Sequence, residues 1–489
     1  MKFKYLGIMN QIMSIHFYYV VVLFLFSFFG WVPILNAKDI EIRTGFEAFN
    51  KKQSTIEGLN SVSVLWRFDS NFYLGQSIYS AALGDAGGAF LWGYEMGKRF
   101  PISSNYALNI SSFIGGGGGA AQVPGDGLML RSYAGISKKL VPNLSLETGV
   151  SYLVIRGSDV DTSAINLGLS YVPDIVLQRK QKTKPGQFKL KAIRPAVRAF
   201  YILGDVKSRS QTKQGNVFLS GAEISFSNNA NSEYFISADG AFEGDGEGYM
   251  NVMLGSRRFW GNQYIRPYGD FSVGFGGGGD IDTGPGAIGS LGVGANLPFG
   301  ENVDLEFGVQ SVMALDSGFK ALSPYARASL VLNRMNLRKK KQKLQYTTNL
   351  NYQIANSHFR KAGNPKTANP ILNSSSMDVF FDDDTYFLGE AQTVMWGDAG
   401  GYAIGLIGLG QNYDLMGNWS IAFEGKFGAA GGGGVQTHGG LVIGAGLEFD
   451  YKFTNKLILS TGVDYLRSLK GVGMAPKILK LGLKIPFEI

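Results

Sequence analysis

Cysteine is absent from this 489-residue sequence, and histidine is nearly so. Without cysteine the chain has no disulfide bond, no thiolate metal site and no lipid-modified thiol. If such a chain is exported, hydrogen-bonded β-structure and burial have to hold it together instead. The three histidines are His16, His358 and His438, so histidine chemistry has few places to occur.

Long apolar runs are also absent, except near the start of the chain. Lys2 and Lys4 precede an apolar stretch at residues 17–32, and Ala37 offers a small residue for cleavage. This order predicts a signal peptide over residues 1–37. The alternative is a retained membrane anchor, but the stretch is shorter than the ~20 residues that a spanning helix needs. Because no later run could cross as a helix, the rest of the chain could enter a membrane only as a closed barrel.

Glycine accounts for 68 residues and aromatic residues for 13% of the chain, yet the mean hydropathy is near zero. This combination indicates apolar side chains that are spread over strands. The formal net charge is +8, and much of the excess lies in two runs, Arg179–Gly186 and Arg338–Lys343. Neither run has interleaved aromatic residues, so we expect no nucleic-acid partner. Solvated linkers that touch anionic lipid headgroups are expected instead.

One signature occurs three times in the same order: a Gly-Asp step, a glycine tract and an alternating segment that begins with asparagine. The copies are Gly84-Asp85, Gly115–Gly119 and Asn143–Val150; Gly244-Asp245, Gly276–Gly279 and Asn302–Val309; and Gly397-Asp398, Gly431–Gly434 and Asn455–Val463. Their spacing is far longer than the ~20–50 residues of a solenoid or propeller repeat. The sequence therefore predicts a triplicated, domain-sized module.

Within each copy the hydrophobic pattern has a period of two. In residues 441–453 the odd positions are apolar, while most even positions are glycine or charged. Only an extended strand turns this pattern into one apolar and one polar face. The first copy contains eight such runs: residues 41–49, 61–68, 72–82, 89–100, 106–114, 128–136, 144–155 and 164–172. Most have about the ~9–11 residues that a tilted strand needs to cross a bilayer.

A soluble β-sandwich would also alternate, but two details favour a membrane barrel. The polar positions combine glycines with carboxylates, as a narrow barrel interior requires. Tyrosine and tryptophan also gather near strand ends, as in an interfacial girdle. These residues are Trp66, Tyr73, Trp92, Tyr94, Trp260, Tyr264, Tyr402 and Trp419.

On these patterns, residues 38–489 resemble the outer-membrane β-barrel proteins of Gram-negative bacteria, in particular the small eight-stranded kind. The resemblance implies export to the periplasm, residence in the outer membrane among its lipids, and insertion by the barrel-assembly machinery. Outer-membrane barrels often end in a strand with a terminal aromatic residue. Here residues 479–489 alternate well, but the last residue is Ile489 and the aromatic Phe487 lies two positions earlier.

The all-β fold predicted from these observations consists of three tandem transmembrane barrels of about eight strands each. We expect the repeats at residues 38–178, 188–332 and 344–489, joined by basic linkers at 179–187 and 333–343. A single barrel of about 24 strands is the alternative. The long polar junctions favour three closed units, because turns inside one barrel are usually short at the periplasmic side.

Two sets of acidic residues are candidate metal ligands. Asp85, Asp245 and Asp398 each precede a glycine or a glycine-rich segment, which favours tight turns over calcium ligation. The carboxylates expected to face inward are Glu147, Asp304, Glu306, Glu448, Asp450 and Asp464. Their spacing does not repeat as metal ligands would. We expect ion-pair networks instead, with basic partners such as Arg131, Arg156 or Arg327, or else water.

The sequence assigns no catalytic, cofactor-binding or metal-ligating residue. The glycine tracts are not followed by the Gly-Lys-Ser/Thr of a phosphate loop, so they are expected to bend a strand at a barrel rim or to permit close backbone contact. We expect a porin-like membrane protein with a structural or transport role and an unidentified ligand. One alternative is a lipid-modifying hydrolase using His438 with Asp398, and another is a surface adhesin.

Overall fold

A computed structural model describes residues 39–50, 55–68, 71–84, 86–119, 125–173, 189–227, 229, 231–261, 264–300, 303–332, 343–363, 369–455 and 457–488. The predicted signal peptide, the linker at 179–187 and residues 333–342 of the second linker lie outside this part. The described residues include no helix that is long and apolar enough to cross a membrane.

The first repeat forms a closed antiparallel barrel in which each strand pairs with its neighbour in sequence and β8 pairs with β1. Its strands are β1 Asp39–Phe49, β2 Ile56–Arg67, β3 Phe72–Gly84, β4 Phe90–Pro101, β5 Tyr106–Gly118, β6 Met129–Val141, β7 Leu144–Ile155 and β8 Asp161–Tyr171. All eight runs predicted from the sequence correspond to these strands. The largest difference at a strand start is in β2, which begins at Ile56 rather than at Ser61.

The second and third repeats close in the same way, so the chain forms three eight-stranded barrels and not one ring of 24 strands. The second barrel contains β9 Lys189–Ile202, β10 Val217–Ser227, β11 Ser232–Gly244, β12 Met250–Phe259, β13 Arg266–Gly277, β14 Ala287–Pro298, β15 Val303–Ala314 and β16 Lys320–Val331. The third contains β17 Lys343–Ile354, β18 Ile371–Phe380, β19 Thr385–Trp396, β20 Ala403–Asp414, β21 Trp419–Gly431, β22 Leu441–Thr454, β23 Leu457–Ser468 and β24 Lys477–Glu488. Lys343, expected in the second linker, is thus the first residue of β17.

Buried charged side chains of the strands lie inside the barrels, and many large apolar side chains lie outside. In β22, Glu448 and Asp450 are 3% and 2% exposed, whereas Phe449 between them is 41% exposed. Large apolar side chains are exposed on the strands of all three barrels, among them Val150, Ile165, Leu167, Leu291, Val293 and Leu481. This distribution is the reverse of that in a water-soluble protein, which buries most of its large apolar side chains and exposes its charged ones.

The two ends of each barrel differ in their connections. Because each barrel has eight strands, its first and last strands begin and end at the same side, which we call the terminal end. Short turns join strands there, such as residues 142–143 between β6 and β7 and residues 415–418 between β20 and β21. At the opposite side, the loop end, connections are longer, as in residues 203–216 between β9 and β10.

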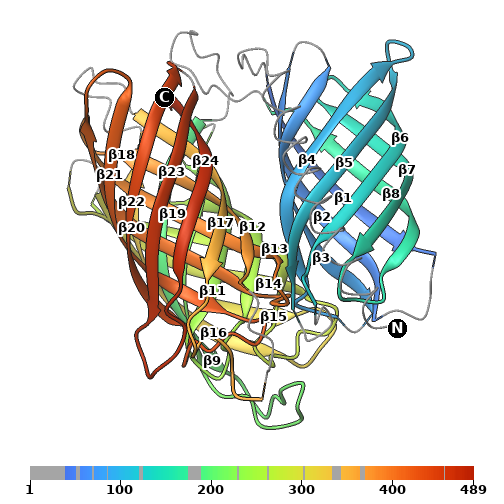
Figure 1. The fold of residues 1–489 in the computed structure, drawn as a ribbon. Helices are drawn as coiled ribbons and strands as arrows, with labels where there is room; N and C mark the ends of the chain where they lie inside the picture. Colours follow the sequence, from blue (N-terminus) through green and yellow to red (C-terminus); the bar gives the residue numbers. More distant parts are fainter. Residues whose placement is uncertain are drawn as a thin grey trace, which may run out of the picture.

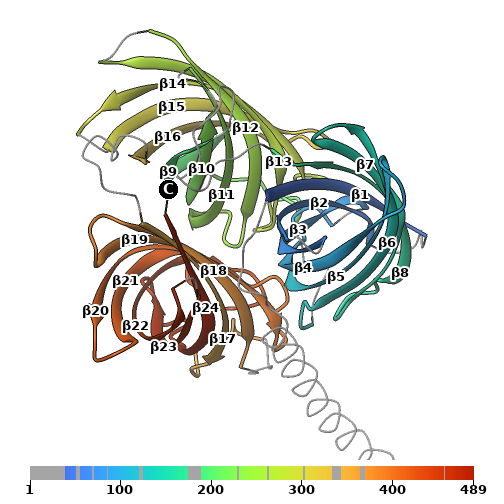
Figure 2. The ribbon, with the colours of Figure 1, turned by 90° about the horizontal axis from the view of Figure 1, so that it is seen from above.

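The three barrels stand side by side with their strands running in similar directions (Figure 1). Viewed from above, they occupy the corners of a triangle (Figure 2). The faces formed by β2–β4, β9–β11 and β17–β19 are turned toward the centre of this triangle.

The exposed apolar faces predict a dependence on membrane depth. Leu291 lies in the interior of β14 and is 65% exposed, whereas Phe299 follows the end of that strand and is 75% exposed. We expect Leu291→Arg to lower the free energy of unfolding in bilayers by about 2–4 kcal/mol, and Phe299→Arg by roughly 0–1 kcal/mol, because the cost of a charge falls toward the interface. Urea unfolding in lipid vesicles measures both. Equal effects would show that β14 does not face hydrocarbon.

Candidate functional site

The terminal half of the first barrel is filled by an ion-pair network. Arg43 lies at its centre, with Nη1 2.7 Å from Oε1 of Glu95, Nη2 2.9 Å from Oε1 of Glu41 and Nε 3.2 Å from Oε2 of Glu147. Arg99 pairs with both Glu41 and Glu147. Every carboxylate of the group is therefore shared between guanidinium groups or hydrogen bonds, which a buried charge requires.

The second barrel repeats this arrangement with three arginines. Arg194 lies 2.9 Å from Glu223 and 2.7 Å from Glu306, while Arg257 Nη1 lies 2.8 Å from Oε1 of Glu223. Arg327 completes the group at 3.3 Å from Oε2 of Glu223. All five side chains are nearly or fully buried, so they fill the lumen rather than line an aqueous path.

The third barrel builds the equivalent network from lysines. Lys426 Nζ lies 2.9 Å from Oδ2 of Asp464, and Lys484 Nζ lies 2.6 Å from Oε2 of Glu448. Lys480 pairs with Glu448 as well. The ammonium groups replace guanidinium groups at the centre, so the repeats share a charge pattern and not a residue type.

The expectation of inward ion pairs is confirmed, although two of its three proposed partners are different. Arg327 joins the network of the second barrel as expected. Arg131 is inward but pairs with Glu47 at 2.6 Å, a carboxylate that the prediction did not include. Arg156 lies in the loop after β7, where it pairs with Asp126 and where its Cζ lies 4.2 Å from the ring centroid of Trp396. It is therefore not an interior partner, and that prediction was wrong.

Most of the inward cations were not among the partners expected from the sequence. They are Arg43, Arg99, Arg194, Arg198, Arg257, Lys426, Lys480 and Lys484. Their signal was available, because each occupies a position of its strand that alternates with outward residues. Lys480 and Lys484, for example, lie in phase with each other between the apolar residues of β24.

The loop half of each barrel interior is filled by apolar side chains. The central members are Leu59, Tyr79, Leu91, Phe113 and Met129 in the first barrel; Phe200, Leu219, Tyr249, Ile288 and Phe319 in the second; and Phe359, Leu372, Tyr402, Val442 and Met474 in the third. In the first barrel the charged half retains a cavity of about 30 Å³, room for roughly one water molecule. The lumens are therefore packed cores.

The alternative catalytic pair is not assembled in the structure. His438 lies between β21 and β22, where Nε2 is 3.0 Å from the carbonyl oxygen of Val472 and Nδ1 is 3.5 Å from Nε2 of Gln436. Asp398 lies in another connection, between β19 and β20, where its backbone N–H donates to Asp126. Among the described residues, neither ring nitrogen of His438 is paired with a serine or a carboxylate. The same residues contain no cluster of acidic and histidine side chains that could hold a metal ion.

The glycine tracts contact the neighbouring barrels, which confirms the close-contact prediction and identifies the partners. A Cβ atom added to Gly116 of the first barrel would lie 2.0 Å from the carbonyl oxygen of Val394 in the third. One added to Gly431 of the third would lie 2.8 Å from the backbone nitrogen of Gly248 in the second. One added to Gly277 of the second would lie 2.5 Å from Cα of Gly88 in the first. No larger residue fits at these positions.

These three contacts follow one rule and close a ring. In each, the tract of one barrel meets the hairpin that contains the Gly-Asp step of another barrel: β19–β20, β11–β12 and β3–β4 in turn. Asp245 and Asp398 lie in two of these hairpins, as the turn prediction expected, while Asp85 lies outside the described residues. The contacts are head-to-tail, and an arrangement of this kind forms a ring when its rotation closes.

Polar contacts reinforce two of the three junctions. Between the first and third barrels, the N–H of Gly401 donates to the carbonyl of Gly117 at 2.7 Å, and that of Gly400 donates to Gly125 at 2.8 Å. Between the second and third, Glu247 accepts from Thr437 at 2.8 Å and pairs with Lys361 at 2.9 Å. Burial raises the pKa of Glu247, but the bonds from Lys361 and Thr437 outweigh it and hold the pKa below its ordinary value of 4.5.

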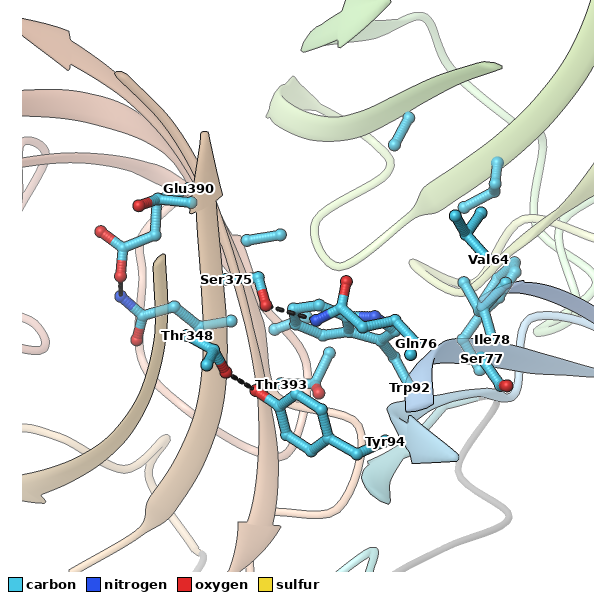
Figure 3. Close-up of a pocket in the computed structure, with 18 of the residues that line it drawn as sticks. Val64, Gln76, Ser77, Ile78, Trp92, Tyr94, Thr348, Ser375, Glu390 and Thr393 are labelled. Atoms are coloured by element: carbon cyan, nitrogen blue, oxygen red, sulfur yellow. Dashed lines mark hydrogen bonds between the residues drawn. The ribbon is translucent and has the colours of Figure 1, made fainter. Parts of the chain in front are cut away.

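The first and third barrels also meet along their strands. Figure 3 shows Gln76 hydrogen-bonded to Ser375, and Tyr94 hydrogen-bonded to Thr348, across the gap between the barrels. Nearer the terminal end, the rings of Trp66 and Tyr346 lie 5.5 Å apart, centroid to centroid. The outward polar groups on this face are thus paired with one another.

A cavity of about 3780 Å³ lies among the three barrels. Outward side chains of all of them line it, for example Val64 and Ile78 of the first, Val252 of the second, and Phe387 and Ile407 of the third. Val64 and Ile78 point into this space in Figure 3. Among the described residues, this cavity has room for a ligand.

No protein-family model matches the chain, and no curated protein is significantly similar to it in sequence. Among solved structures, similar ones include OpdQ of Pseudomonas aeruginosa, with 12% identity over 92% of this chain and 97% of that one and a TM-score of 0.21. The siderophore receptor PirA of Acinetobacter baumannii has 11% identity over 93% and 81%, with a TM-score of 0.29. The copper transporter OprC has 10% identity over 92% and 80%, with a TM-score of 0.29. Scores this low support no inference about function.

The interior networks predict unequal effects for two adjacent arginines. Arg257 is fully buried among carboxylates, whereas Arg258 is exposed and donates to Ser232. We expect Arg257→Met to lower the free energy of unfolding by about 3–5 kcal/mol, because it leaves buried carboxylates without a partner. Arg258→Met serves as the control and should change stability by less than about 0.5 kcal/mol, as surface substitutions do. Urea titration in detergent compares the two, and equal effects would contradict the assignment.

The glycine junctions predict that barrels stay associated after the chain is cut. With a protease site inserted in the linker at 179–187, the cleaved first barrel should co-elute with the rest of the protein. Combining Gly116→Leu with Gly277→Leu should release it, because both side chains would overlap neighbouring backbone. Gly425→Leu is the control, since a Cβ there meets nothing within 4 Å. Retention of the first barrel in the double variant would show that other contacts hold the ring.

Proposed function

We propose that this chain is an integral outer-membrane protein of a Gram-negative bacterium, built as a ring of three non-conducting barrels with a structural or transport role. One observation carries the proposal: three closed barrels have charged interiors and apolar exteriors. Outer-membrane barrels have this distribution because their outer faces contact lipid while their backbone groups are paired within the sheet.

Energetics support a membrane rather than an aqueous setting. Removing a Leu, Val, Ile or Phe side chain from water is favourable by ~1.5–3 kcal/mol. The strands of the three barrels expose many such residues, so transfer of these faces from water to hydrocarbon is favourable.

The connections support one orientation. Outer-membrane barrels have short periplasmic turns and longer extracellular loops. The terminal end therefore faces the periplasm, and the loop end, with the glycine junctions, faces outward. Both basic linkers join strands at the terminal end, where they would lie near periplasmic lipid headgroups. Insertion by the barrel-assembly machinery remains a prediction from the resemblance.

Packing supports a role without a lumenal pore. Ion pairs fill one half of each interior and apolar clusters fill the other half, as is usual when eight strands close a barrel. Transport of a solute through any single lumen would require these groups to leave. A transport role would instead use the surfaces between or around the barrels.

Fractionation followed by electrical recording tests this proposal. We expect the protein in the outer-membrane fraction, and we expect the purified protein to show no large stable conductance in planar bilayers. A porin of 16–18 strands recorded under the same conditions is the positive control. Recovery as a soluble periplasmic protein would refute membrane insertion. A wide, steady conductance would refute the packed lumens.

A further inference from the structure

The cavity among the barrels has mainly apolar walls, and polar groups on the face between the first and third barrels are paired across it. Gln76 and Tyr94 reach across to Ser375 and Thr348, and the hydroxyls of Tyr346 and Ser375 lie 3.0 Å apart. The lining is also continuous with the apolar outer faces of the strands. Lipid hydrocarbon, which contacts those outer faces, therefore also matches the walls of the cavity.

The cavity is too large for a small-molecule site. Its volume of about 3780 Å³ is more than three times the ~1,000 Å³ at the upper end of ligand pockets. Protein interiors leave few voids larger than a water molecule, so a space of this size requires an occupant. Flexible hydrocarbon chains can fill an irregular space that no rigid ligand would match.

The two ends of the cavity differ, and the difference selects one side of the membrane. At the loop end, junction residues Gly248, Gly401 and Gly431 line the cavity, so the glycine ring forms a roof. At the terminal end Trp66 and Phe487 line it, each the penultimate residue of its strand, and among the described residues no glycine junction closes it there. Trp92 and Trp396 line it near the loop end. Aromatic side chains at strand ends mark the interface between hydrocarbon and headgroups.

We propose that the cavity binds phospholipid from the periplasmic leaflet, with acyl chains extending between the barrels toward the glycine roof and headgroups at the aromatic mouth. The inference deepens the proposed function and rests on it, because it requires that the barrels span the membrane. It identifies the ligand class as a glycerophospholipid held by its hydrocarbon chains. The enclosed lipid would be shared by all three barrels and would differ from the exchanging lipid around the perimeter.

Two glycines allow the cavity to be filled without disturbing its walls. Gly389 of β19 and Gly405 of β20 line the cavity, and a Cβ atom added to either meets nothing within 4 Å. Gly425 of β21 is the matched control, because a Cβ there also meets nothing within 4 Å but the residue does not line the cavity. None of the three has a positive φ, so a tryptophan is compatible with each backbone.

The experiment measures phospholipid that remains with the protein after extensive washing in detergent. Protein from outer membranes is washed, its lipids are extracted, and phospholipid and lipopolysaccharide are quantified per chain by mass spectrometry. We expect wild type and Gly425→Trp to retain at least one phospholipid per chain, and the Gly389→Trp/Gly405→Trp double variant to retain less than half as much. Heat-dependent mobility on gels verifies folding, and the single variants replace the double variant if it does not fold.

Each other outcome counts against the inference. Equal retention in all variants would place the lipid elsewhere, and retention of lipopolysaccharide alone would assign the cavity to the outer leaflet. Wild-type protein that loses all its phospholipid would leave the cavity without this occupant. Failure of the proposed function is distinguishable, because in that case fractionation finds the protein outside the membrane before any lipid is measured.

Discussion

Closure of each sheet by eight strands is the constraint on which the rest of this structure depends. A strand edge cannot be left unpaired in hydrocarbon, so β1 must meet β8, and the second and third repeats must close in the same way. Eight strands enclose a space only wide enough for side chains. Once the outer faces are apolar, the charged residues can only point inward. They then have to pair with one another, because an unpaired buried charge is costly.

Because of the same constraint, the lumens are filled by side chains and offer no path for a solute. A guanidinium such as Arg257 contacts several carboxylates at once, so it cannot leave without exposing them to an apolar setting. Lys426 likewise pairs with three carboxylates in the third barrel. The interior networks of the repeats are therefore built with either arginine or lysine as the cation. What distinguishes this chain from a single small barrel is the contact between repeats, and this contact is made by glycine.

The sequence predicted the fold closely because its signals are local. Period-two alternation identifies strands, and the two-faced pattern identifies which residues point inward. The alternation could not identify interior partners. The pairing of Arg43 with Glu95, for example, joins β1 to β4 and depends on the direction in which these long side chains extend across the lumen. Arg156 was misplaced although the alternation was informative: it follows Ile155, the last residue of β7, and is in phase with the outward residues Val150 and Tyr152. The tracts were correctly expected to allow close approach, but the partner of Gly116 lies in another repeat, which no local pattern can reveal.

The shape of the inner space follows from what separates the barrels at its two ends. At the loop end nothing larger than glycine lies between backbones, so Gly277 and Gly88 bring two barrels into direct contact. Nearer the terminal end, the rings of Trp66 and Tyr346 lie between the first and third barrels and keep their backbones apart. Three cylinders that touch at one end and are spaced by side chains at the other must enclose a space that is closed above and open below. A roofed apolar cavity is therefore a geometric consequence of where the sequence places its glycines and its aromatic residues.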